Sequence, residues 1–219
     1  MKKLILFFCL LISIELAAQE NSADSLLNDL MTVAEPTTAE LLPERMLITQ
    51  RMLWGQNGLY RKVGIAPRTL TAASRERELK ARRNMFRVHQ TLGLVTAAGM
   101  LAQGIVGSRL YKPGSNINFD KLKNTHEGIA TGINIGYFTT ALMSFTAPPP
   151  MVNRKKFDNI KLHKILSYVH LSGMIATNVL SKQIDGNANP ANIKKWHRAA
   201  AFTTFGAYTA AIATIKFEF

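Results

Sequence analysis

The chain has a single cysteine, Cys9, among 219 residues. A disulfide framework and a cysteine-based metal site are therefore both excluded. Acidic residues are also scarce, because 14 Asp and Glu stand against 27 Lys and Arg and the formal net charge is +13. An excess of this size indicates an anionic partner such as nucleic acid, an anionic membrane surface or an anionic ligand. Aromatic residues make up only 8% but apolar residues 47%, which is enough to bury a core and argues against a disordered chain.

The first residues have the pattern of a targeting segment. Lys2 and Lys3 form a basic start, residues 4–16 are an apolar core, and Ala17 and Ala18 supply small residues before a polar stretch. This order predicts a cleaved secretory signal over residues 1–18, with a short uncleaved anchor as the alternative. Cys9 lies inside the apolar core and not at its end, which argues against a lipoprotein acylation site.

Residues 19–87 are polar and contain no long apolar run, so we predict an extramembrane segment that is partly helical. A helix can begin at Pro43 and carry Met46, Leu47, Leu53 and Trp54 on one face, which suits a membrane surface or the rest of the protein. Residues 74–87 are strongly basic and are also predicted to be helical.

Four charge-free runs follow, over residues 88–108, 128–153, 165–181 and 199–215. Each is close to the roughly 17–25 residues that span a bilayer core. The fold class predicted is all-α: an integral membrane four-helix up-down bundle over residues 88–216. The alternative is a soluble bundle of four buried helices, which would show charged outer faces.

Four of the five histidines open these runs, one in each: His89, His126, His163 and His197. Because successive helices cross in opposite directions, His89 and His163 are predicted near one membrane face, and His126 and His197 near the other. In an up-down bundle the first and third helices are diagonal partners, as are the second and fourth. Each same-side pair can therefore point at a common centre, as the two axial ligands of a haem do.

An internal repeat relates the two halves of the bundle. The residues at offsets +3, +6, +10, +11 and +13 from His89 and from His163 are the same types, Leu, Val, Gly, Met and Ala. Offsets +4 and +11 from His126 and His197 are Ala and Tyr in both cases. The glycines at +10, Gly99 and Gly173, either leave space beside a macrocycle or serve ordinary helix packing.

Haem suits these histidines better than a bare metal ion, which would need three or four close ligands. No C-x-x-C-H motif is present, so the prediction is two non-covalent b-type haems, each with two imidazole ligands. Basic residues flank the ligands and can pair the propionates, with interfacial anchoring as the alternative; they are Arg87, Lys123, Lys164 and Arg198. His170, seven residues after His163, is an alternative ligand or a polar contact deeper in the bundle, and His163 is favoured because it fits the repeat.

Four helices with one histidine near each start, paired first with third and second with fourth, resemble the core of the cytochrome b-561 family. The resemblance covers roughly residues 87–216 and rests on histidine spacings of 37, 37 and 34 and on the repeat. It implies a transmembrane di-haem cytochrome in which His89, His126, His163 and His197 bind iron. Members of that family often have six helices, and this departure leaves ascorbate chemistry open.

The predicted function is transmembrane electron transfer, with no catalytic side chain named and with donor, acceptor and oligomeric state open. A non-redox membrane scaffold and a proton or metal-ion transporter are the alternatives. The predicted partners are membrane lipid and an electron donor and acceptor that the sequence does not identify; no nucleic-acid partner is predicted. The predicted location is the bacterial inner membrane, with residues 19–87 in the periplasm if the signal sequence decides the topology. The positive charge of residues 74–87 and of 154–156 favours the reverse orientation.

Overall fold

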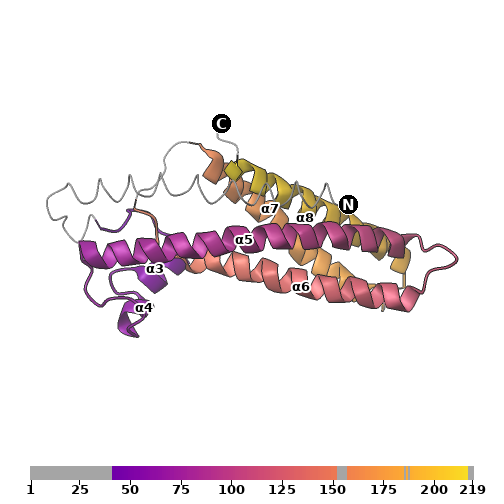
Figure 1. The fold of residues 1–219 in the computed structure, drawn as a ribbon, viewed down its shortest axis with the longest axis horizontal. Helices are drawn as coiled ribbons and strands as arrows, with labels where there is room; N and C mark the ends of the chain where they lie inside the picture. The colour runs from indigo at the N-terminus through magenta and orange to yellow at the C-terminus, as the bar shows by residue number, and fades with distance from the viewer. Residues whose placement is uncertain (1–40, 152–156, 185, 187, 217–219) are drawn as a thin grey trace. The chain divides into compact units, whose positions relative to one another are not determined.

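The structure is a computed structural model that describes residues 41–151, 157–184, 186 and 188–216. The predicted signal segment and residues 19–40 lie outside the described residues. Every regular element described is a helix: α3 (Ile48–Trp54), α4 (Leu59–Lys62), α5 (Ala72–Tyr111), α6 (Phe119–Thr146), α7 (Asn159–Gln183) and α8 (Pro190–Lys216) (Figure 1). The all-α prediction is therefore confirmed for this part of the chain.

The chain divides into two compact units, and α5 contributes to both. The described part of unit 1 comprises residues 41–83 and 148–151, and unit 2 holds the rest. The four histidines and the helix segments that carry them all belong to unit 2. The sequence predicted two helical segments before and after residue 87, whereas the structure joins them in one helix of 40 residues.

Side-chain caps fix where the long helices begin. The backbone N–H of Lys121 donates to Asn118 Oδ1, and that of Lys161 donates to Asp158 Oδ1, each at 2.9 Å. Thr71 and Ser74 cap the start of α5 reciprocally, since each side-chain oxygen accepts from the other's N–H, at 2.8 and 3.2 Å. Such caps satisfy N–H groups that the first helical turn leaves unpaired. Three successive prolines after Ala147 prevent α6 from continuing.

The four helices of unit 2 share one core. Its buried members come from all four helices: Ala97, Met100, Ile133, Tyr137, Met174 and Tyr208. Hydrogen bonds join α5 to α6, α6 to α7, α7 to α8 and α8 back to α5. Each helix therefore has two neighbours and one diagonal partner, and α5 lies diagonal to α7 as α6 does to α8.

The contacts also show how the neighbouring helices run. His89 near the start of its run meets Thr140 near the end of α6, and His163 meets Ala211 near the end of α8. The two contacts give the antiparallel hairpins α5–α6 and α7–α8 the same register, in agreement with the internal repeat. The four helices are drawn in Figure 1.

Gly99 and Gly173 serve packing between the helices of each hairpin. A Cβ added to Gly99 would lie 3.1 Å from Ile133 Cγ1. A Cβ added to Gly173 would meet the Thr204 side chain. Ile133 and Thr204 each lie seven residues after their helix's histidine, so the two contacts are equivalent in the repeat. Of the two roles that the sequence left open, the observed contacts support helix packing.

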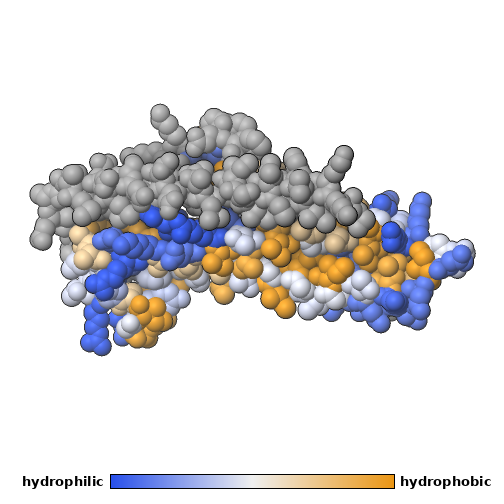
Figure 2. Space-filling view, viewed as in Figure 1, coloured by the Kyte–Doolittle hydropathy of each residue, from blue (hydrophilic) through white to orange (hydrophobic). Residues whose placement is uncertain are grey.

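By length and composition, α5 alone among the described helices is apolar enough to cross a membrane. The other three predicted spans contain many Ala, Gly, Ser and Thr residues and fall short of that measure. Their outer faces are nevertheless apolar, and exposed large side chains occur on all four helices, including Val95, Ile105, Ile135, Leu142, Ile165, Ile175, Val179 and Phe202. Hydrophobic residues cover the middle of the visible face of α5 and α6, and hydrophilic residues gather at the loop between them (Figure 2).

Unit 1 is built around buried charge. Arg75 is fully buried, donates to the Leu41 and Pro149 carbonyls at 2.8 and 2.7 Å, and pairs with Glu78 at 2.7 Å. Arg61 pairs with the other Glu78 oxygen at 2.6 Å. The prolines after α6 thus supply carbonyl acceptors, and Arg82 donates to a second one, that of Pro148, at 2.6 Å. Burial lowers the pKa of Arg82 to about 10, so this guanidinium remains charged at neutral pH.

The predicted helix from Pro43 is shorter than expected. The structure begins α3 at Ile48 and ends it at Trp54, where Gly55 follows. Residue Leu47 at the helix start provides no side-chain cap, and Pro43 is buried outside the helix. The predicted apolar face is split as well, because Trp54 is buried whereas Leu47 is exposed.

Candidate metal centres

The four predicted ligands lie at two ends of unit 2, His89 and His163 at one and His126 and His197 at the other. His89 and His163 lie close enough for charge on one ring to act on the other. The same holds for His126 and His197. Both pairs join diagonal helices, α5 with α7 and α6 with α8. All four imidazoles are partly buried.

Three of the four rings are held by a main-chain carbonyl of the neighbouring helix in the same hairpin. Nδ1 donates to Thr140 O from His89 at 3.0 Å, to Ala211 O from His163 at 2.8 Å, and to Thr177 O from His197 at 3.0 Å. Each acceptor lies 14 residues after the histidine of its own helix. A carbonyl only accepts, so Nδ1 carries the proton and the neutral ring keeps its lone pair on Nε2.

His126 is held differently. Its Nδ1 is buried and has no hydrogen-bond partner among the described residues. The ring packs on α5 at Gly107, where an added Cβ would lie 2.9 Å from His126 Cε1 and 3.4 Å from Nδ1. Gly107 therefore makes room for this imidazole, a role that the sequence did not reveal.

His170 belongs to the end of unit 2 that carries His89 and His163, and is near enough for their charges to act on it. Its Nδ1 shares a hydrogen bond of 2.6 Å with the Tyr137 hydroxyl. The ring also contacts Tyr208, with the two ring centroids 5.0 Å apart. The structure thus gives His170 polar and aromatic partners in the core, which favours the second of the two roles predicted for it.

Sequence reasoning found Tyr137 and Tyr208 only as members of the repeat. The structure places both in the core with ring centroids 5.8 Å apart, and the Tyr208 hydroxyl donates to Gly93 O at 3.2 Å. Their shared offset of +11 from His126 and His197 was the available signal. No sequence signal marked the carbonyl groups that accept from the histidines, because every residue has a main-chain carbonyl.

The basic residues predicted near the ligands are all at least partly exposed. Lys123 Nζ lies 4.0 Å from a Glu127 carboxylate oxygen, and the Arg198 guanidinium lies 4.7 Å from the centre of the Tyr111 ring. Arg87 and Lys164 are exposed beside His89 and His163. Their proposed contact with propionates stays a prediction.

No family model, curated protein or solved structure matches the chain. The function proposed below therefore rests on the histidines of unit 2 and their hydrogen bonds. Among the described residues, no group of three or more His, Cys, Asp and Glu side chains could hold a metal ion. Unit 2 carries the pair His89 and His163 at one end, beside His170, and the pair His126 and His197 at the other. Nε2 is the lone-pair nitrogen on the three rings that a carbonyl holds.

Proposed function

We propose that the chain is a membrane electron carrier whose unit 2 binds two b-type haems, one between His89 and His163 and one between His126 and His197. The observation that carries the proposal is the anchoring of Nδ1 in His89, His163 and His197. Metal-binding histidines commonly donate their other ring N–H to a carbonyl, which fixes the ring and makes Nε2 more basic. The cytochrome b-561 resemblance belongs to the same proposal.

The chemistry of the donor set suits haem. His89 with His163, and His126 with His197, would each hold one haem, which would supply reversible one-electron chemistry. Between the two ends the core contains Ala97, Met100, Ile133 and Met174, all of them buried.

The proposed membrane location rests on the exposed apolar side chains of the four helices and on the lack of charge in their runs. The one span that α5 provides by composition is weak support taken alone. The exposed faces of the four runs carry no charged residue, and apolar side chains such as Val95, Ile135 and Leu142 are more than 60% exposed. A soluble protein rarely exposes so many large apolar side chains, whereas a lipid-facing helix does. We assign the span region to the inner membrane of a bacterium.

The decisive experiment is a spectrum. The full chain, expressed with an adequate haem supply and purified in detergent, should show sharp reduced-minus-oxidised bands and two haems b per chain by pyridine haemochrome assay. Circular dichroism of the same sample reports whether the helices have formed. Helical protein that is colourless and takes up no added haem would contradict the proposal.

A further inference from the structure

Large apolar side chains are exposed along the two short helices of unit 1. Ile48 and Met52 lie four residues apart on α3 and are 79% and 66% exposed. Gln50 and Trp54, on the opposite side of the same helix, are buried. Residues Leu59 and Val63 repeat the pattern around α4, where Arg61 is the buried residue.

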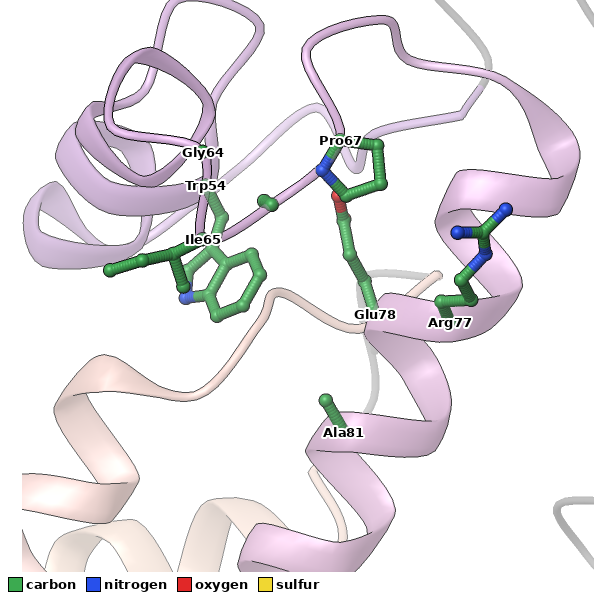
Figure 3. Close-up of a pocket in the computed structure, with 8 residues that line it drawn as sticks. Trp54, Gly64, Ile65, Pro67, Arg77, Glu78 and Ala81 are labelled. Carbon is green, nitrogen blue, oxygen red and sulfur yellow. The ribbon is translucent and has the colours of Figure 1, made fainter.

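These residues form what we call the apolar surface of unit 1: Leu47, Ile48, Met52, Leu59, Val63 and Ile65. Figure 2 shows a hydrophobic cluster at α4 beside hydrophilic residues. Ile65 also lines a shallow open pocket of about 440 Å³, together with Trp54, Pro67 and Glu78 (Figure 3). Six large apolar side chains exposed within 19 residues are more than scattered surface apolars and indicate a binding surface.

Charge decides what this surface binds. Residues 41–83 contain ten Lys and Arg and three Glu. Of the three glutamates, Glu78 is buried between two arginines and Glu76 pairs with Lys80 at 2.8 Å. Arg51, Lys62 and Arg68 are exposed in the same segments as the apolar residues. The surface is therefore apolar with a cationic surround.

We propose that the apolar surface of unit 1 inserts into the interface of an anionic bilayer. Apolar side chains that enter the headgroup boundary by about 5–10 Å, flanked by Lys and Arg, are the features of interfacial helices. The anionic headgroups satisfy the surrounding cations at the same time. This inference rests on the membrane location proposed above but not on haem binding.

The test uses the full chain in a Cys9→Ser background with single cysteines at Met52 or Val63, each labelled with an environment-sensitive fluorophore. Ala73→Cys and Thr69→Cys, at exposed positions of the same unit, are the matched controls. The proteins are reconstituted into vesicles of phosphatidylcholine with phosphatidylglycerol, or of phosphatidylcholine alone.

In the anionic vesicles we expect the labels at 52 and 63 to emit at shorter wavelength and to lose quenching by aqueous iodide, while those at 69 and 73 stay accessible. The shielding should weaken in pure phosphatidylcholine and on adding salt, which shortens the screening length to about 3 Å at 1 M. Arg51→Glu combined with Lys62→Glu should weaken it as well.

Three results would overturn the inference. They are equal iodide access at all four positions, equal shielding in neutral vesicles, and shielding that persists in amphipathic polymer without a bilayer. The last would mean that protein covers the surface. Carbonate extraction of the same vesicles shows separately whether the chain is embedded, so an embedded chain with accessible labels refutes this inference alone.

Discussion

An imidazole binds iron only through a nitrogen that carries no proton, and the carbonyls of Thr140, Ala211 and Thr177 decide which nitrogen that is. The proton is held on Nδ1, so Nε2 is available without a change of tautomer. Because the acceptors are main-chain groups of packed helices, this choice does not depend on a mobile side chain. Three of the four proposed ligands therefore keep Nε2 as the nitrogen with a lone pair.

Pairing of the ligands can be tested one residue at a time. His89→Ala and His163→Ala should each remove the same haem, and His126→Ala and His197→Ala the other, leaving about half of the haem in each case. His170→Ala is the matched control, since His170 does not fit the repeat that His89 and His163 share, and it should keep both haems. Haem content and redox titration of the purified variants are the measurements. Loss of one common haem in His89→Ala and His126→Ala would contradict the pairing.

Gly107 offers a test of how His126 is positioned. In Gly107→Ala the new Cβ would lie 2.9 Å from His126 Cε1, so the ring must shift and binding at the His126–His197 end should weaken, at a cost of about 1–3 kcal/mol. Gly104→Ala on the same helix meets nothing within 4 Å and should bind haem as the parent does. Haem titration of both variants distinguishes them, and equal affinities would show that the ring does not depend on this glycine.

At the scale of elements, the first turns of α5 hold unit 1 together through charge. Arg75 is fully buried and satisfies Glu78 and the carbonyls of Leu41 and Pro149 together. A buried ion pair of this kind is not strongly stabilising in itself, but removing one partner leaves the other unpaired in the interior.

Arg75→Ala should therefore destabilise unit 1 by about 3–5 kcal/mol. Arg77→Ala, two residues away and exposed, should change stability by less than about 0.5 kcal/mol. Hydrogen exchange of residues 41–83 in the full chain is the measurement, since it reports unit 1 separately from unit 2. Unchanged protection in Arg75→Ala would show that the network does not stabilise unit 1.

At the scale of the whole molecule, the two histidine pairs are separated along the helices of unit 2. The 14-residue offset between His126 and Thr140 corresponds to about 21 Å of helix. A redox site at each end shortens the distance that an electron must cross, which suits a relay more than storage or sensing.

Liposomes loaded with ferricyanide and carrying the protein should oxidise an external reductant faster than protein-free liposomes. The double variant His126→Ala, His197→Ala should lose this gain while keeping the haem of the other pair. Transfer by that variant at the parent rate would rule out a two-site path. Two fully loaded sites without transfer in the parent would indicate a partner on one side of the membrane only.

The sequence determined the helical class of the described residues, the approximate helix positions after residue 87 and the register of the two hairpins. These follow from local patterns, namely charge-free runs and repeated offsets from each histidine. Only the tertiary structure decided that Arg75 and Arg61 are buried, that Gly107 accommodates His126 and that carbonyls fix three imidazoles. The residue type alone does not say whether an arginine is buried or exposed, or which of the many main-chain carbonyls accepts from a histidine. Their roles depend on which segments, far apart in the chain, lie against each other.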